Sequence, residues 1–334
     1  MKILITGGAG FIGSHLVDKL LDEDHEVYVI DNLSTGSLEN IRHNLENNHF
    51  HFVQEDICNY DVLYDLCSKC NLIFHLASSV GVKYIMDNPV KSLNSNILSS
   101  ISIIKIAADL KKRIVVFSTS EIYGKNKSPE LRENDDRIIG NSFRWSYSIG
   151  KAVAEYYCYA YGKEMDLDYV VIRCFNIVGP RQVGNYGMVL PRLVGQALRN
   201  EPMTVYDDGT QIRTFTHVSD LVNILCLIIE NTETNKEIFN VGSSNSISII
   251  DLANRIKAIT NSLSEITFIP SREVFGSDFE DPKVRIPSAD KILSIIGEYS
   301  FLDIDEIINN VVQYFIKTYN LEAKSIFEAS LVSE

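Results

Sequence analysis

The sequence has 334 residues, 45% hydrophobic and 22% charged, a composition typical of a folded protein with one large or two small domains. Its formal net charge of −13 argues against a nucleic-acid-binding surface, which needs a basic patch. No apolar run reaches the roughly 18 residues of a membrane span. The chain begins directly on a predicted strand with no signal peptide before it, so we expect a cytoplasmic protein.

The segment 3–13, ILITGGAGFIG, predicts a strand, a glycine-rich turn and the start of a helix. This order is the context that a dinucleotide-binding motif requires. Glycine lets the backbone approach a pyrophosphate, and a helix start offers unpaired N–H groups and a positive dipole end. We therefore predict cofactor contacts at Gly7, Gly10, Phe11, Ile12 and Gly13.

A second apolar segment, 26–30, ends in Asp31, near the offset expected for the carboxylate that binds the ribose hydroxyls of a dinucleotide. No arginine follows directly, and a carboxylate at this position repels a 2′-phosphate. The sequence therefore favours NAD over NADP as the cofactor.

Strand-like and helix-like segments alternate through the first half of the chain. The strand-like segments are 51–53, 72–77, 113–118 and 169–173, and the helix-like ones are 60–67, a long segment from Pro89, and 146–161. Apolar strands separated by helices predict an α/β fold with a doubly wound parallel sheet, whose ligands bind at the carboxyl ends of the strands.

Beyond 179–181 the alternation weakens, which predicts a smaller mixed α/β lobe that binds the substrate. The predicted division is a dinucleotide-binding domain at 1–177 with 215–242, a lobe at 178–214 with 243–320, and a carboxyl-terminal tail at 321–334. Residues 239–241 are expected to return to the main sheet.

Tyr147 and Lys151 stand at an i, i+4 spacing in the predicted helix 146–161, which places them on one helix face. A phenol with the ordinary pKa of about 10 is a weak base at neutral pH. A neighbouring ammonium and a cationic nicotinamide both favour the phenolate, so we expect a lowered pKa for Tyr147. Thr119, just past a predicted strand, can hydrogen-bond the substrate hydroxyl that Tyr147 deprotonates.

These motifs resemble those of the extended short-chain dehydrogenase/reductase family of nucleotide-sugar epimerases, dehydratases and decarboxylases. The resemblance runs from Met1 to about Val312 and is carried by TGGAGFIGSHL, DNLSTG, HLA at 75–77, STSEIYG at 118–124, YSIGK, RCFNIVGPR and TVYDDGTQIRTFTHVSDLV. It implies that NAD takes hydride from C4 of a nucleotide-diphosphate sugar, with UDP as the expected nucleotide.

The resemblance also assigns residues. The further cofactor-binding residues that it implies are Asn32, Ser34, Thr35, Gly36, Asp56, Ile57, Leu76 and Ala77, together with Tyr147 and Lys151. It implies contacts from Asn176 and Arg213 to the nucleotide diphosphate. Lys83 is expected in a loop that approaches the sugar, where it would suit a carboxylate.

The residues around Thr119 favour one branch of the family. In 4,6-dehydratases an aspartate follows this threonine as the acid, whereas here the residue is Ser120. Ser120 and Glu121 resemble the pair in UDP-glucuronate decarboxylases, where they serve the C5–C6 end of the sugar. The segment 143–147 (FRWSY) and Arg285 are also similar to those enzymes, and Arg285 is expected to place the substrate. UDP-glucuronate decarboxylation is therefore the favoured reaction.

Three alternatives stay open. A UDP-sugar 4-epimerase, acting on a glucose or glucuronate derivative, needs only Thr119, Tyr147 and Lys151, which are all present. A 4,6-dehydratase is less favoured because of Ser120. A non-enzymatic NAD-binding regulator is disfavoured because such proteins lose the tyrosine or the lysine.

Two further expectations concern assembly and metals. Apolar residues of two predicted helices exceed what one sheet face requires (Ile97, Ile101, Ile104, Val153, Tyr157 and Ala160), and the family resemblance implies that they form a homodimer interface. Cys67 and Cys70 form a lone CxxC without a second pair, so no metal site is expected.

Overall fold

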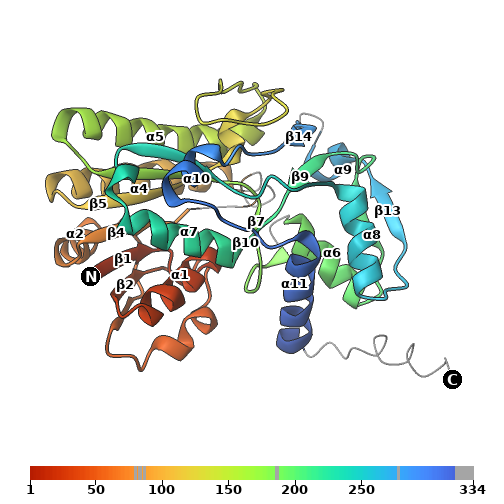
Figure 1. Cartoon of the computed structure of the whole chain (residues 1–334), viewed down its shortest axis with the longest axis horizontal. Coiled ribbons are helices and arrows are strands. Elements are labelled where there is room, and N and C mark those ends of the chain that lie inside the picture. Colours follow the sequence, from red (N-terminus) through yellow and green to blue (C-terminus); the bar gives the residue numbers. More distant parts are fainter. Residues whose placement is uncertain (79–80, 82–84, 86–87, 185–187, 277–278, 320–334) are drawn as a thin grey trace.

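The computed structural model describes residues 1–78, 81, 85, 88–184, 188–276 and 279–319. Its largest element is a seven-stranded parallel sheet with the order β11-β6-β5-β4-β1-β2-β3 (Figure 1). The strands are β1 (Lys2–Thr6), β2 (Glu26–Ile30), β3 (Phe50–Val53), β4 (Leu72–His75), β5 (Arg113–Thr119), β6 (Tyr169–Cys174) and β11 (Glu237–Val241). This order reverses beside β1, as in doubly wound folds, and confirms the predicted fold class.

Helices cover both faces of the sheet. One face carries α1 (Phe11–Asp22), α7 (Val218–Glu230) and α10 (Asp290–Ile296), and the other α2 (Tyr60–Lys69), α4 (Pro89–Asp109) and α5 (Ser146–Met165). Because side chains alternate along a strand, Ile3 and Ile5 of β1 join the core beneath α1, whereas Leu4 joins the core beneath α4. The strands are consequently apolar throughout, which is the pattern the sequence displays.

The second lobe has its own apolar core, built from α6 (Val189–Leu198), α8 (Ile249–Ile259), α11 (Ile304–Tyr319) and β8 (Met203–Tyr206). Strand β8 pairs with β13 (Ile266–Ile269), and a three-stranded sheet has the order β12 (Ser246–Ser248), β9 (Ile212–Thr214), β14 (Val284–Arg285). The short strands β7 (Ile177–Val178) and β10 (Thr216–His217) pair with each other, and α9 (Ser271–Phe275) follows β13. In Figure 1 these elements lie beside the carboxyl ends of the main sheet.

The chain crosses between the two parts more than once. Helix α10 comes after the lobe strands in sequence, inside the range predicted for the lobe, yet Ile292 packs into the core beneath α7. The predicted boundaries themselves stay a prediction, and the predicted tail 321–334 lies outside the described residues. Short 3-10 helices complete the chain: η1 (Leu38–Asn40), η2 (Arg42–Asn44), η3 (Ser120–Tyr123), η4 (Phe143–Trp145) and η6 (Thr232–Thr234).

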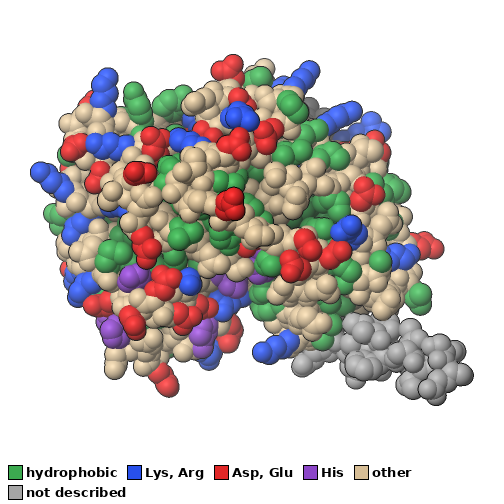
Figure 2. Space-filling model, viewed as in Figure 1, with side chains coloured by type: hydrophobic (Ala, Val, Ile, Leu, Met, Phe, Trp, Pro, Cys, Tyr) green, Lys and Arg blue, Asp and Glu red, His purple; other side chains and the backbone are tan. Residues whose placement is uncertain are grey.

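The surface bears mixed charge. On the face that Figure 2 shows, Lys and Arg side chains are interspersed with Asp and Glu. None of the helices in the described ranges has the length and apolar composition needed to span a membrane. Within those same ranges, no group of three or more His, Cys, Asp or Glu side chains could hold a metal ion.

Candidate active site

A cleft of about 1120 Å³ opens at the carboxyl ends of the sheet strands and collects most of the predicted site residues. It is lined by these predicted cofactor residues: Gly7, Gly10, Phe11, Ile12, Gly13, Asp31, Asn32, Ser34, Thr35, Asp56, Ile57, Leu76, Ala77, Tyr147 and Lys151. Gly36 does not line the cleft. It lies behind the glycine turn instead, where an added Cβ would come within 2.9 Å of the Ala9 carbonyl carbon.

The glycine turn fits a pyrophosphate because its residues carry no side chains, so the phosphates can come close to the backbone N–H groups. The tight backbone also has no room for a Cβ atom. Gly7 has a φ of +73°, and a Cβ on Gly13 would lie only 2.3 Å from the Gly7 carbonyl oxygen. Helix α1 starts directly after Gly10, with no side-chain cap and no acidic residue in its first turn. Its amino-terminal dipole therefore faces the cleft uncompensated, which favours an anion there.

Asp31 lies at the end of β2 with its carboxylate turned back toward this turn. Its carboxylate oxygens accept hydrogen bonds from the backbone N–H groups of Ala9 (3.0 Å) and Leu33 (2.8 Å). Burial raises the pKa of Asp31, and the two N–H donors oppose that rise. Asn32 donates to Asp56 (2.8 Å) and ties together the two loops that flank the predicted adenine end.

The predicted catalytic residues Thr119, Ser120, Glu121, Tyr147 and Lys151 all line the same cleft. Thr119 ends β5, and its hydroxyl oxygen accepts a hydrogen bond from the Glu121 N–H (3.2 Å). The hydroxyl proton of Thr119 is thus available to a substrate oxygen. Tyr147 and Lys151 lie one turn apart on α5, as the i, i+4 spacing predicts.

Burial dominates the pKa of both groups on α5. It lowers the pKa of Lys151 to about 8, against opposing contributions from Cys174 and Glu155. It raises the pKa of Tyr147, and the Glu121 carboxylate raises it further. The lowered pKa expected for Tyr147 beside Lys151 and a cationic nicotinamide is therefore not found in the protein alone, because burial disfavours the phenolate.

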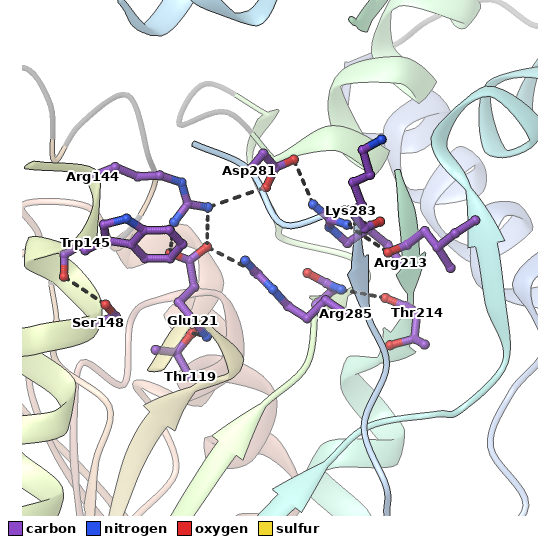
Figure 3. A network of polar contacts seen from close by, with 12 residues as sticks. Thr119, Glu121, Arg144, Trp145, Ser148, Arg213, Thr214, Asp281, Lys283 and Arg285 are labelled. Carbon is purple, nitrogen blue, oxygen red and sulfur yellow. Dashed lines mark hydrogen bonds and ion pairs between the residues drawn. The ribbon is translucent and has the colours of Figure 1, made fainter. Parts of the chain in front are cut away.

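Glu121 is held between two arginines at the other end of the cleft (Figure 3). Both of its oxygens accept hydrogen bonds from Arg144 (3.0 and 3.2 Å), and one also accepts from Arg285 (3.1 Å). Burial raises the pKa of Glu121, but the two guanidinium groups lower it more, to about 2. Glu121 is consequently ionised near neutral pH and has no proton to give.

The two arginines keep donors to spare. Within the described part of the chain, Arg144 Nε and Arg285 Nη2 are buried and have no hydrogen-bond partner. An unpaired buried donor is costly, so this end of the cleft is suited to an additional acceptor. Both residues line the cleft together with Glu121.

The remaining predicted substrate residues are placed differently. Asn176 lines the cleft and donates to the Thr214 carbonyl oxygen (2.8 Å). Arg213 is absent from the lining and instead contacts Asp281 (2.7 Å), whose other oxygen lies 3.6 Å from Arg144 (Figure 3). Lys83 lies outside the described residues.

Arg144 is the main site residue absent from the predicted set. It occupies η4, one turn before Tyr147, and its side chain is only 3% exposed. Its guanidinium also lies over the Trp145 ring, 4.5 Å from the ring centroid. The position three residues before the tyrosine, at helical spacing, is the signal that could have identified it.

Comparisons with known proteins extend across both parts of the chain. The profile of the NAD dependent epimerase/dehydratase family matches residues 3–242. UDP-glucuronic acid decarboxylase 1 of Xenopus tropicalis is 36% identical over 328 residues, covering 97% of this chain and 74% of that protein. UDP-N-acetyl-alpha-D-glucosaminuronate decarboxylase of Bacillus cytotoxicus is 34% identical over 322 residues, covering 96% and 99%. The solved structure of a UDP-glucuronic acid 4-epimerase from Bacillus cereus, with UDP-glucuronic acid and NAD, matches with a TM-score of 0.86 and 28% identity, covering 95% and 99%.

Proposed function

This chain belongs to the NAD dependent epimerase/dehydratase family, and we propose that it decarboxylates a UDP-linked uronic acid, with UDP-glucuronate as the favoured substrate. NAD is its cofactor, and the glycine turn, the start of α1 and Asp31 are the residues that hold it. The two curated relatives described above are named as decarboxylases of UDP-glucuronic acid and of a UDP-linked N-acetylglucosaminuronate. Both names support a uronate as the substrate of this chain.

The arginine pair around Glu121 is the observation that carries the proposal. Arg144, Arg213 and Arg285 bear three positive charges, and Glu121 and Asp281, which are paired with them, supply two negative charges, so one positive charge remains. A uronate brings a carboxylate that can accept from the two spare donors, and a hydrogen bond between charged groups is roughly twice as strong as a neutral one. A neutral hexose offers these donors only uncharged hydroxyl oxygens, which form weaker hydrogen bonds with guanidinium groups than a carboxylate does.

Oxidation at C4 begins the proposed reaction. NAD, when bound, accepts hydride from that carbon. Tyr147 takes the proton of the C4 hydroxyl, and the hydroxyl of Thr119 donates a hydrogen bond to the same oxygen. The Lys151 ammonium stabilises the phenolate form of Tyr147. Because the pKa of Lys151 is about 8, most Lys151 side chains carry the needed charge at neutral pH.

Decarboxylation follows from the ketone. With a carbonyl at C4, the C5–C6 bond breaks, carbon dioxide leaves, and the electron pair of that bond moves toward the C4 oxygen. Tyr147 and Thr119 hydrogen-bond the resulting enolate oxygen, and C5 then takes a proton from water, which leaves the 4-keto pentose. Arg144 and Arg285 hold the carboxylate before it leaves. Glu121 keeps both guanidinium groups in place, and because it is ionised it cannot be the acid that supplies the proton.

Product analysis tests the proposal directly. Incubation of the purified holoenzyme with UDP-glucuronate should release carbon dioxide and leave a UDP-pentose or its 4-keto precursor. UDP-galacturonate without carbon dioxide would replace the proposal with 4-epimerisation. That reaction is the second candidate, because Thr119, Tyr147 and Lys151 suffice for it and the B. cereus epimerase matches this fold.

Assembly and location are further parts of the proposal. The outer faces of α4 and α5 carry exposed apolar side chains, including Ile149 (46%), Tyr156 (65%) and Tyr159 (61%). Two copies of the chain could bury these faces against each other as a homodimer. Ile104, which the sequence analysis assigned to this interface, is instead fully buried within a single copy. Sedimentation at micromolar concentration tests the dimer. Six free cysteines favour a reducing compartment such as the cytoplasm.

A further inference from the structure

A buried carboxylate lies on α5 behind the proposed catalytic residues. Glu155 follows Lys151 by one helical turn, and its side chain is 1% exposed. It accepts hydrogen bonds from Arg173 Nε (3.1 Å) and Nη2 (2.8 Å), from Arg137 Nη2 (2.6 Å) and from the Ser118 hydroxyl. Glu155 does not line the cleft, so it cannot touch substrate or cofactor.

The hydrogen bonds of Glu155 to Ser118 and Arg173 join α5, β5 and β6 close to the predicted catalytic residues. Ser118 and Arg173 face each other across β5 and β6, and the next pair in register is Thr119 and Cys174. The carboxylate therefore ties α5, which carries Tyr147 and Lys151, to the end of β5, which carries Thr119.

The same network continues under η3. Arg173 Nη1 donates to the Tyr123 hydroxyl and to the Glu133 carbonyl oxygen, both at 2.8 Å. Tyr123 in turn donates to Asn240 of β11 (2.7 Å). The turn that holds Ser120 and Glu121 thus rests on hydrogen bonds that lead back to Glu155.

Stability alone gives a weak reason for such an arrangement. Apolar residues of similar volume often stabilise a core as well as a buried ion pair does. Hydrogen bonds to a charged group are directional, however, and a misplacement of about 1 Å in an active site can cost about a hundredfold in rate.

We propose that Glu155 is a positioning residue for oxidation at C4, which holds Tyr147 and Lys151 on α5 in register with Thr119 through Ser118 and Arg173. The inference rests on the proposed function in taking C4 oxidation as the step that needs this register. It adds to that function a residue outside the cleft.

Glu155 also raises the pKa of Lys151, against the larger and opposite effect of burial. The titratable groups that act on Lys151 are Glu155 of its own helix, Cys174 of β6 and His75 of β4, and Glu155 is itself paired with Arg137 and Arg173. Burial lowers the pKa of His75 to about 3 and raises that of Cys174 to about 12, so both are neutral near pH 7. Glu155 is then an anion whose removal would lower the pKa of Lys151.

Three variants of the holoenzyme test the proposal. In Glu155→Gln, kcat for UDP-glucuronate should fall about tenfold to a hundredfold with KM and bound NAD unchanged. Its pH–rate profile should move to lower pH by about half a unit or more. Ser118→Ala removes one hydrogen bond and no charge, so kcat should fall less and the pH profile should stay in place. Glu164→Gln, at an exposed position on the same helix, should match the wild type.

Unchanged kcat and an unchanged pH profile in Glu155→Gln would overturn the proposal. Should that variant fail to fold, wild-type kcat in Ser118→Ala would overturn it equally. A substrate-free readout separates this inference from the proposed function: a ¹³C-NMR titration of Lys151, assigned with Lys151→Met, should give a lower pKa in Glu155→Gln. A wild-type chain inactive on every UDP-sugar refutes the function, whereas an unshifted Lys151 pKa refutes the role of Glu155.

Discussion

The two ends of the cleft are built in different ways. The cofactor end consists of backbone: a glycine turn with no space for a Cβ, an uncapped helix start, and Asp31 hydrogen-bonded to N–H groups of nearby residues. The sugar end consists of charged side chains, with Glu121, Arg144, Asp281 and Arg285 drawn from separate segments of the chain (Figure 3).

This difference corresponds to two chemical tasks. A dinucleotide is recognised by a local shape that a dozen consecutive residues can form. Discrimination between a uronate and a hexose depends on one carboxylate, and the charges that meet it must be brought together by tertiary structure. Tyr147 and Lys151 lie between the two ends, so that a single change there should remove the reaction while leaving both ends intact.

Tyr147→Phe should have the largest effect. Loss of the phenolic hydroxyl should lower kcat about a thousandfold, because no other described residue of the cleft replaces the base. Bound NAD should be retained, as measured from the absorbance of the purified protein. Tyr157→Phe on the same helix is the control. Full turnover by Tyr147→Phe would mean that the base is misassigned.

Arg285→Gln should weaken binding of the uronate at the sugar end without affecting the binding of NAD. Glu121 would keep only Arg144, and kcat/KM for UDP-glucuronate should fall about a hundredfold. The affinity for NAD, measured by fluorescence titration, should not change. Arg272→Gln, at an exposed position of the same lobe, serves as the control. An equal loss of NAD affinity would show that the two ends are not separable.

Gly13→Ala should weaken the binding of NAD without affecting recognition of the sugar. A Cβ at this position would lie 2.3 Å from the Gly7 carbonyl oxygen, so the turn must shift away from its phosphate-binding geometry. NAD affinity should weaken about tenfold or more, while the preference for UDP-glucuronate over UDP-glucose at saturating NAD stays the same. Wild-type NAD affinity in this variant would contradict a backbone-built site.

Acid sensitivity should reveal the smallest effect, at the sugar end. The folded-state pKa of Glu121 lies near 2, below the ordinary value of 4.5, so its ion pairs stabilise the fold above pH 4.5. That contribution should be lost as pH falls from about 4.5 to about 2. Urea unfolding across this window should show a steeper loss of stability in the wild type than in Glu121→Gln. Parallel curves would mean that the arginines do not hold Glu121 ionised.

Elements made of consecutive residues could be read from the sequence. The glycine turn, Asp31 at the end of β2, and the pairing of Tyr147 with Lys151 depend on local backbone geometry and helical spacing, and the apolar strands follow from burial on both faces. The family's motifs lie on these same local elements, which is why the fold class and NAD could be predicted together.

Tertiary structure alone decided what depends on burial and on distant charges. It placed α10 beneath the sheet rather than in the lobe, joined Arg144 and Arg285 on one carboxylate, and set Glu155 behind Lys151. It also determined the pKa of Tyr147 in the protein alone, which burial raises, because the cost of removing a phenolate from water is a property of the folded environment. Sequence spacing specifies which side chains share a helix face, but electrostatic energies depend on distances and solvent exclusion that exist only once the chain has folded.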